Sequence, residues 1–395
     1  ILVRPGDILE MVNSIIKALK DRDLSRSMAV EARKKVEREY SLTKMTDDTI
    51  KVYEDACKIK NMLVIKFGAI GDVILIVPSL RLLRNNFPDA RISVLIGQES
   101  KNILKNCPYV DELILYDKKS RDKGLKGMLK ISKFLRRKNF DMSVDFQNNR
   151  ISHAISWLGA IPQRFGYGNG KFSFFVNKRI KYLKIRATPL DEQFRILKSA
   201  GLDTTGASRY LETWPSKEDF LYIERFLKNA WVSNSQILVG MNIGSSPRWE
   251  TKRWPLKKFA KLSDMLAEKD IRVVLTGSAD ATSATRDFMN ISGTKPVNAV
   301  GQTSIGQLGA LIKRCRIFIT GDSAPLHIAS SVGTDFIALF GPTDPARHFE
   351  PNEKGIVIRK DIKCSPCYKS KCKKNRCMES ISVEEVYKLV MEKIV

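Results

Sequence analysis

The stretch MLVIKFGAIGDVILIVPSLRLLRNNFP, residues 62–88, decides the fold class. It begins with an apolar, β-rich run, turns at two glycines and continues as a helical pattern. Gly68 and Gly71 permit a tight turn between a strand and a helix whose first amides can meet an anion. A strand, a glycine turn and a helix at this spacing predict one unit of a βαβ fold with a parallel sheet.

The same alternation continues along the chain, and it loosens only between about residues 160 and 235. Further strands are expected at residues 90–97, 110–117, 141–147, 235–246, 271–278, 316–322 and 335–342. We therefore predict two doubly wound α/β domains, at residues 61–230 and 231–395, that face a cleft. In open α/β sheets ligands bind at the carboxyl ends of strands, so each strand-to-helix turn is a candidate site.

Residues 1–60 differ from the rest of the chain. They form helical patterns rich in charge, contain no apolar strand, and offer Asp7 as an N-cap. The chain begins with Ile1 rather than Met, which we interpret as the sign of a missing upstream piece.

The composition is strongly basic. The 395 residues include 68 Lys and Arg against 43 Asp and Glu, a net charge of +25. This charge favours anionic partners, namely nucleic acid, acidic lipid or phosphorylated small molecules, and a generally basic proteome is the alternative. The cations are spread along the chain without an arginine-rich helix or tail, so we expect no nucleic acid among the partners.

The sequence shows no signal peptide and no apolar run of about 18 residues, the length of a membrane-spanning helix. We therefore expect a cytoplasmic chain that is at most peripheral on the inner membrane.

The first glycine turn places Asp72 at the start of a helix. The turn matches neither the G-x-G-x-x-G pattern nor a P-loop, because no Lys-Ser or Lys-Thr pair follows the glycines. An acid here is stabilised by the helix dipole, so Asp72 is either a helix cap or a catalytic carboxylate.

A second turn, NIGSSPRWETKRWP at residues 242–255, combines small hydroxyl side chains with cations. These groups suit the oxygens of a diphosphate, and a solvated loop is the alternative. They are Ser245, Ser246, Arg248, Lys252 and Arg253.

A third turn, GDSAPLHIAS at residues 321–330, follows an apolar strand pattern. Asp322 is either a helix cap or a ligand-binding acid. His327, one of three histidines in the chain, is either a helix-face residue or part of the same site.

Four stretches together resemble the heptosyltransferase family, glycosyltransferase family 9. They are KFGAIGDVILIVPSLRLLRNNFP, GSSPRWETKRWP, GDSAPLHIASSVGT and ALFGPTDPARHFEP, and the resemblance extends from residue 62 to the end. It implies the GT-B architecture of two Rossmann-like domains. It also implies inverting, metal-independent transfer of heptose from ADP-heptose to the lipopolysaccharide inner core at the cytoplasmic membrane face.

The resemblance also implies roles for single residues. Asp72 matches the general base on the acceptor hydroxyl, and Lys252 matches the lysine that stabilises the donor diphosphate. Arg150 and Arg164 are assigned to an anionic acceptor by their location alone. The expected donor-binding residues are Ser245, Ser246, Lys252, Asp280, Asp322, Ser323, Ala324 and His327.

Two other functions remain open at this point. Members of the family differ in their donor, so another nucleotide sugar is the nearest alternative. From a different class, the chain is a non-catalytic nucleic-acid or membrane-binding module. The combination of Asp72, Lys252 and Asp322 argues against that class.

Four cysteines, Cys364, Cys367, Cys372 and Cys377, are clustered near the C-terminus. In a reducing compartment such a set can bind zinc or an iron–sulfur cluster, and free or partly oxidised thiols are the alternative. No cofactor is expected for catalysis itself.

Residues 1–60 resemble the C-terminal tail of a different, retaining GT-B glycosyltransferase of the family 4 type. The resemblance rests on Pro5-Gly6-Asp7, Met28 with Ala32-Arg33, Tyr40-Ser41 and Tyr53-Glu54. It implies a remnant without catalytic residues.

Overall fold

A computed structural model describes residues 1–183, 185–246 and 248–394, and the chain divides into two units, Ile1–Ile59 and Lys60–Val395. The first unit holds three helices, α1 (Ile8–Lys20), α2 (Arg22–Glu39) and α3 (Leu42–Cys57). Asp7 caps α1 as expected, because its carboxylate accepts a hydrogen bond of 2.9 Å from the Glu10 amide. Neither α1 nor α2 buries a residue.

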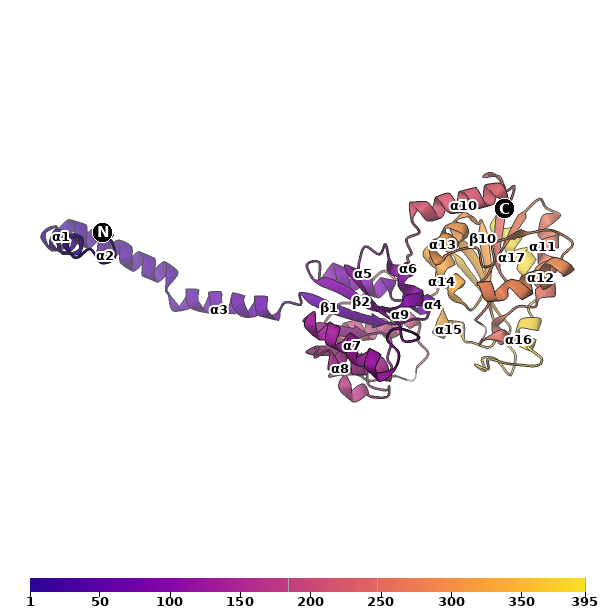
Figure 1. The fold of residues 1–395 in the computed structure, drawn as a ribbon, viewed down its shortest axis with the longest axis horizontal. Helices are drawn as coiled ribbons and strands as arrows, with labels where there is room; N and C mark the ends of the chain where they lie inside the picture. Colours follow the sequence, from indigo (N-terminus) through magenta and orange to yellow (C-terminus); the bar gives the residue numbers. More distant parts are fainter. Residues whose placement is uncertain (184, 247, 395) are drawn as a thin grey trace. The chain divides into compact units, whose positions relative to one another are not determined.

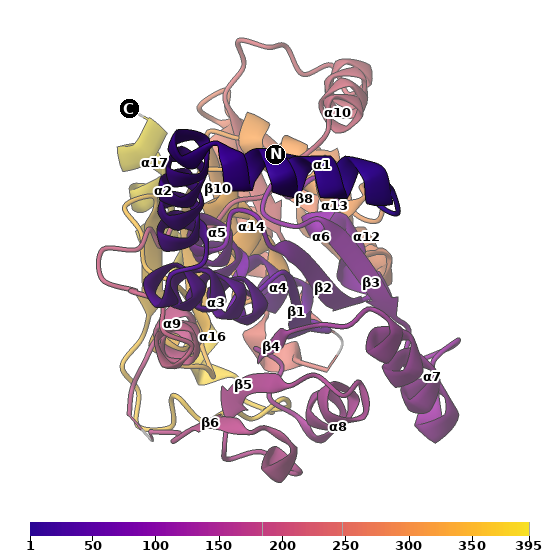
Figure 2. The same cartoon turned by 90° about the vertical axis from the view of Figure 1, so that its left-hand side faces the viewer.

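The second unit begins with a parallel sheet whose strands are β1 (Asn61–Lys66), β2 (Arg91–Gly97), β3 (Glu112–Tyr116), β4 (Met142–Asp145), β5 (Gln163–Tyr167) and β6 (Lys178–Ile180). They lie in the order β3-β2-β1-β4-β5-β6, which Figure 2 shows. Val64 of β1 is in register with Val94 of β2 and Val144 of β4. Because helices cover both faces, the four inner residues of β1, Met62–Ile65, are all apolar and buried rather than alternating.

The helices of this first domain are α4 (Ile70–Ile74), α5 (Val77–Asn86), α6 (Lys101–Leu104), α7 (Gly124–Arg137), α8 (Arg150–Leu158) and α9 (Pro189–Ser199). Two 3-10 turns, η1 (Gln98–Ser100) and η2 (Ser173–Phe175), complete it. Helices α5 and α9 pack together on one face of the sheet, and α7 and α8 pack together on the other (Figure 2). Ile131 and Leu135 of α7 share a buried core with Leu63 and Ile65 of β1.

The second domain repeats this architecture with β7 (Leu238–Asn242), β8 (Arg272–Thr276), β9 (Val297–Asn298), β10 (Ile317–Gly321), β11 (Asp335–Phe340) and β12 (Gly355–Arg359). Their order is β12-β11-β10-β7-β8-β9, again parallel. Met241 of β7 is in register with Leu275 of β8 and Ile319 of β10. In each domain the order reverses between the first and fourth strands, and ligands bind at such a point in doubly wound folds.

The helices of the second domain are α10 (Lys217–Asn229), α11 (Leu256–Ala267), α12 (Thr282–Ile291), α13 (Ile305–Arg314), α14 (Ala324–Ser331), α15 (Pro345–His348), α16 (Arg376–Glu379) and α17 (Val383–Ile394). Short turns η3 (Glu250–Lys252) and η4 (Ala279–Ala281) follow β7 and β8. Figure 1 shows α11 and α12 on one side of the sheet and α13 and α14 on the other.

Helix α10 packs with the second domain, earlier in the chain than the expected boundary at residue 231. Its Ile223 and Leu227 share a core with Leu238 of β7 and Leu311 of α13. The apolar face of α10 is therefore covered by the second sheet and its helices.

In the described part of the chain, no helix combines the length and the apolar character that crossing a bilayer requires.

Candidate active site

A cavity of about 640 Å³ lies at the carboxyl ends of β7 and β10. Residues 244–246, 248–249 and Lys252 line it after β7, and residues 322–325 line it after β10. Residues 69–72 of the first domain line the same cavity. It therefore lies between the first glycine turn and the point where the strand order of the second sheet reverses.

Lys252 and Asp322 form an ion pair inside this cavity. The Lys252 ammonium lies 2.6 Å from the Asp322 carboxylate, and the two side chains are only 13% and 6% exposed. Thr343 donates a hydrogen bond of 2.7 Å to the same carboxylate oxygen. The ammonium also lies 4.8 Å from the centroid of the Trp249 ring. These partners fix one cation at the wall of the cavity, where it can meet an anion.

The local chain geometry explains how the pair forms. A Cβ atom on Gly321 would lie 2.7 Å from the Lys252 carbonyl oxygen, so a larger residue would push η3 away from β10. Thr251 donates a hydrogen bond of 2.7 Å to the Lys369 carbonyl, which holds η3 from its other side. The loop that contains the clustered cysteines thereby supports the position of Lys252.

Helix α14 presents its N-terminus to the cavity. Ser323 is the N-cap, but its side chain makes no capping hydrogen bond and is held by Asn242 at 3.2 Å instead. The first amides of a helix lack intrahelical partners and carry partial positive charge. Ser323 and Ala324 line the cavity as expected, so this end of α14 can bind an anion.

His327 makes contact with the first domain. A Cβ atom on Gly71 would lie 2.5 Å from Cδ2 of the His327 ring, so Gly71 allows α4 to pack directly on α14. Burial lowers the pKa of His327, and nearby Asp322 and Asp72 only partly oppose this. Burial likewise lowers the pKa of His348, which lines the same cavity. His327 therefore serves as a packing surface between the domains.

Asp72 is the most accessible acid of the site, with its side chain 53% exposed. Its carboxylate accepts a hydrogen bond of 3.2 Å from the Ala69 amide, so it does contribute to the helix start. The Lys66 ammonium lies 3.5 Å from the same oxygen and donates a hydrogen bond of 3.3 Å to the Phe146 carbonyl. About half of the Asp72 side chain is therefore open to a substrate.

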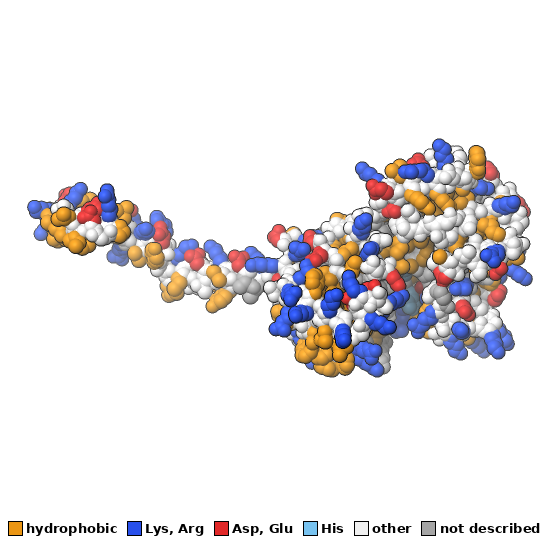
Figure 3. Space-filling view, in the orientation of Figure 1, with side chains coloured by type: hydrophobic (Ala, Val, Ile, Leu, Met, Phe, Trp, Pro, Cys, Tyr) orange, Lys and Arg blue, Asp and Glu red, His pale blue; other side chains and the backbone are white. Residues whose placement is uncertain are grey.

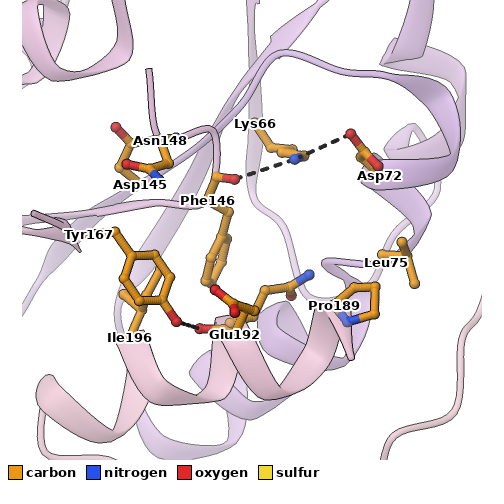
Figure 4. A pocket seen from close by; sticks show the side chains of 11 residues that line it. Lys66, Asp72, Leu75, Asp145, Phe146, Asn148, Tyr167, Pro189, Glu192 and Ile196 are labelled. Atoms are coloured by element: carbon orange, nitrogen blue, oxygen red, sulfur yellow. Dashed lines mark hydrogen bonds and ion pairs between the residues drawn. The ribbon is translucent and has the colours of Figure 1, made fainter. Parts of the chain in front are cut away.

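A second cavity, of about 220 Å³, lies on the first-domain side of Asp72 (Figure 4). Its polar lining comes from the strand ends of the first sheet and from α9. Three carboxylates and one ammonium line it, a set that suits a neutral molecule rich in hydroxyls better than an anion. The polar residues are Lys66, Asp72, Asp145, Asn148, Tyr167, Glu192 and Gln193.

Asp145 organises the turn at the base of this second cavity. One oxygen of its carboxylate accepts hydrogen bonds of 2.8 and 2.9 Å from the Gln147 and Asn148 amides. Burial raises the pKa of Asp145, although His153 lies 3.6 Å from its other oxygen and opposes the rise. Gln147 in turn accepts a hydrogen bond of 2.9 Å from the Phe67 amide. This network ties the turn after β4 to the glycine turn after β1.

The remaining predicted residues lie in several environments. The Ser245 hydroxyl lines the first cavity, but it donates to the Trp249 carbonyl and accepts from Arg253. Ser246 lines the same cavity. Asp280 is exposed in η4, accepts a hydrogen bond from Ser278, and does not line the cavity.

The two predicted acceptor-binding arginines line neither cavity. Arg164 donates to the Phe175 and Ile161 carbonyls, and burial lowers its pKa. Its guanidinium thus holds the backbone on either side of β5, and its assignment to the acceptor stays a prediction. Arg150 is exposed at the start of α8, so its role remains a prediction.

The structure does not support the metal site that was considered for the clustered cysteines. Within the described ranges, no three His, Cys, Asp or Glu side chains are arranged to hold a metal ion. Cys364 and Cys372 are exposed, whereas Cys377 is buried in the core of the second domain, where burial raises its pKa. All four are free thiols, which is the alternative given above.

Several residues in or beside the two cavities were not expected from the sequence. Lys66 is the last residue of β1 and Asn148 lies three residues after β4, and this closeness to a strand end was a usable signal. Thr343 and His348 lie inside the stretch ALFGPTDPARHFEP, but no pattern distinguished them from their neighbours. Glu192 lies on α9, within the region where the strand and helix patterns loosen.

Comparisons with known proteins match this description. The sequence profile of Glycosyltransferase family 9 (heptosyltransferase) matches residues 128–378, more than half of the chain. Lipopolysaccharide heptosyltransferase 3 of Escherichia coli (strain K12) is 29% identical over 287 residues, which are 69% of this chain and 80% of that protein.

Solved structures share the architecture. The structure of the glycosyl transferase family 9 from Veillonella parvula DSM 2008 has a TM-score of 0.77 and 26% identity, and it covers 85% of this chain and 97% of its own. The E. coli ADP-heptose lps heptosyltransferase II has a TM-score of 0.67 and 22% identity, covering 84% and 98%. The likeness confirms the expected GT-B fold of two Rossmann-like domains.

Proposed function

Because this chain belongs to glycosyltransferase family 9, the heptosyltransferase family, and is a glycosyltransferase, we propose that it transfers heptose from ADP-heptose to the lipopolysaccharide inner core. The non-catalytic module considered above is thereby set aside. The names of the relative from E. coli and of the ADP-heptose enzyme with the same fold support this donor and this acceptor.

One observation carries the proposal: Asp72 lines both cavities. The larger cavity offers a cation and the free amides of a helix, which suit the diphosphate of a sugar nucleotide. The smaller one offers carboxylates and amides, which suit the hydroxyls of an acceptor sugar. A carboxylate between them is within reach of both substrates.

The reaction then needs one base and one stabilised leaving group. The Asp72 carboxylate takes the proton of the acceptor hydroxyl while the hydroxyl oxygen forms a bond to the anomeric carbon of the donor. The bond from that carbon to the diphosphate breaks, and its electron pair leaves with ADP. Attack from the face opposite the leaving group inverts the anomeric carbon.

The charge that develops on the leaving diphosphate is met by groups of the protein. We assign this role to the Lys252 ammonium and to the amides of Ser323 and Ala324, which line the same cavity. Asp322 acts through Lys252, because its carboxylate holds the ammonium 2.6 Å away. We therefore expect transfer to proceed without a metal ion.

The acceptor is a glycolipid, so the enzyme is expected to work at the cytoplasmic surface of the inner membrane. The net charge of +25 favours an anionic membrane surface. The origin of residues 1–60 as a remnant of another glycosyltransferase remains a prediction.

The test uses the full chain, radiolabelled ADP-heptose and lipopolysaccharide that lacks heptose, with other nucleotide sugars in parallel. We expect transfer from ADP-heptose, with Asp72→Asn lowering kcat by roughly 10²- to 10⁴-fold and leaving the donor Kd unchanged. Asn keeps the size of the side chain but cannot take the proton.

Each part of the proposal has its own contrary result. Failure of the wild type with every nucleotide sugar would refute the transfer reaction. Transfer from another nucleotide sugar alone would replace the donor. Full activity of the Asp72→Asn variant would remove Asp72 as the base while leaving the reaction in place.

A further inference from the structure

One surface of the first domain, outside both cavities, combines exposed aromatic rings with a row of cations. It is formed by α7, by α8 and by the loop that leads into η2. Helix α7 packs on α8, and α8 packs on η2, so the three form one continuous side of the domain. Figure 3 shows apolar side chains gathered at the lower rim of this domain, with Lys and Arg around them. We call it the cationic–aromatic surface.

The charge of this surface has one sign. Residues 123–140 contain seven Lys and Arg, residues 146–190 contain eight, and neither segment contains Asp or Glu. Lys126, Lys130 and Lys133 are exposed on α7, and Lys171 is exposed beside η2. Two cations of these segments are paired with acids elsewhere in the chain, Lys138 with Glu112 and Arg186 with Asp344. The exposed lysines of α7 and Lys171 still give this side of the domain a positive field, which favours an anionic partner.

The same surface exposes large apolar side chains. Trp157 of α8 is 47% exposed, and Phe172 and Phe174 are 48% and 63% exposed. Trp157 stacks on Phe175 with 4.4 Å between ring centroids, and the three phenylalanines contact one another. On α7, Leu125 and Leu129 are 66% and 47% exposed and lie one turn apart.

We propose that the cationic–aromatic surface binds the anionic face of a lipid bilayer, with the rings of Phe172, Phe174 and Trp157 inserted among the headgroups and the lysines on lipid phosphates. Aromatic rings prefer the membrane–water interface, and cations near anionic lipid add attraction at each position. The exposed Leu125 and Leu129 favour a bilayer over a nucleic acid, because a leucine side chain, unlike an aromatic ring, does not stack on a base.

The position of the surface connects it to the smaller cavity. Asn148 lines that cavity and donates a hydrogen bond of 3.1 Å to Asn169, three residues before Phe172. The His153 ring is hydrogen-bonded at 3.1 Å to the Lys171 carbonyl on the same loop. A single loop therefore joins Phe172 to the smaller cavity. The sugar of a lipid anchored in the bilayer beside Phe172 would lie close to that cavity. This second step rests on the proposed function, whereas bilayer binding does not.

The first experiment measures binding of the full chain to vesicles by flotation. We expect binding to vesicles of phosphatidylethanolamine and phosphatidylglycerol, weaker binding to vesicles of phosphatidylcholine, and loss of binding as salt is raised. No binding to the anionic vesicles would overturn the proposal. Tighter binding to a DNA duplex, with displacement of the vesicles, would reassign the surface to nucleic acid and would overturn it as well.

Two variants locate the contact, and each has a matched control on the second domain. Lys126→Glu with Lys130→Glu should weaken vesicle binding roughly 30-fold or more, whereas Lys228→Glu with Lys257→Glu, also exposed, should change it little. Phe172→Ser with Phe174→Ser should weaken binding roughly tenfold, whereas Phe220→Ser with Leu221→Ser on α10 should not. Equal losses in test and control pairs would contradict the assignment.

The second experiment separates this proposal from the transfer reaction. The lysine variant should retain transfer to a short water-soluble acceptor, and it should lose transfer to the glycolipid in anionic vesicles by a factor similar to the loss in binding. If no variant or wild type transfers sugar, the flotation result still decides the bilayer contact. Equal transfer to both acceptors despite lost flotation would refute acceptor delivery through this surface.

Discussion

The two domains share one strand order, and each places its polar groups at the point where that order reverses, yet the groups differ in charge and burial. In the second domain Lys252, the cation proposed to meet the leaving diphosphate, is 13% exposed and lies 2.6 Å from Asp322. In the first domain Asp72, the proposed base, is 53% exposed and lies 3.5 Å from Lys66.

This difference follows from the task of each turn. A group that neutralises a leaving diphosphate works best when it is fixed in place before the reaction, and burial with partners fixes it. A general base must reach a substrate hydroxyl and release its proton later, so it benefits from open access. One fold thus supports a rigid anion site and an accessible carboxylate.

The largest effect that would test this contrast is expected for Lys252→Met. It should lower kcat by roughly 10²- to 10³-fold, because it removes a fixed donor to the developing charge. Lys66→Met should have less than about a tenfold effect, because the Lys66–Asp72 pair is long, at 3.5 Å, and its Asp72 side is 53% exposed to solvent. Steady-state kinetics of both variants measure the difference, and equal losses would contradict the contrast.

Measurements of stability show whether Lys252→Met loses activity because the cation is missing or because the fold is weakened. Lys252→Met leaves the buried Asp322 carboxylate with Thr343 alone and should destabilise the fold by about 3 kcal/mol. Lys252→Met with Asp322→Asn should regain most of that stability, measured by urea unfolding, without regaining activity. The exposed Lys257→Met serves as the unaffected control.

A substitution at the contact between the two domains should have the next largest effect. Gly71→Ala places a Cβ atom 2.5 Å from the His327 ring, so one of the two helices must shift. We expect the free energy of unfolding to fall by about 1–3 kcal/mol and the activity to fall as well. Adding His327→Ala should relieve the clash, so activity of the double variant should exceed that of Gly71→Ala. Independent, additive losses would show that the contact does not position Asp72.

The fold of both domains was largely predictable from the sequence. Most of the strands that were expected, from residues 62–68 to 335–342, lie inside their sheets and are largely buried, so their apolar runs are long and clear. Strands β5, β6, β9 and β12 were missed. Strand β5 holds few apolar residues, and β6, β9 and β12 lie at the edges of their sheets. All three residues of β6, an edge strand of its sheet, are at least partly exposed.

The site was predictable only where one turn supplied the groups. Asp72, Lys252 and Asp322 each lie in a turn after a recognisable strand, so their sequence positions indicated them. The smaller cavity combines Lys66, Asn148 and Glu192 from three distant segments. A local sequence pattern does not predict that such segments lie close together. The sequence position of Arg164 likewise does not reveal that its guanidinium donates to two backbone carbonyls.

A smaller effect is expected in the first domain for Asn148→Ala. It should raise the KM for the acceptor roughly tenfold through the loss of hydrogen bonds, and leave the donor Kd unchanged because Asn148 does not line the larger cavity. Acceptor titrations at saturating ADP-heptose measure the change. Asn177→Ala, an exposed asparagine before β6, is the control. A change in donor Kd would contradict the separation of the two cavities.

The smallest effect concerns pH and again separates the domains. Burial lowers the pKa of His327 below its ordinary value of 6.5, so below that pH the unfolded chain binds a proton that the folded chain does not. Stability should therefore fall as the pH drops below 6.5, by at most about 1.4 kcal/mol per pH unit for this group. Burial raises the pKa of Asp145 instead, so the contribution of Asp145 to the stability falls as the pH rises.

Urea unfolding at pH 7.5, 6.5 and 5.5 (about one unit apart) measures the combined effect of these groups on the stability. The variant His327→Gln should reduce only the loss of stability on the acid side. An unchanged acid-side loss in that variant would assign the effect to another group, such as His348, whose pKa burial also lowers.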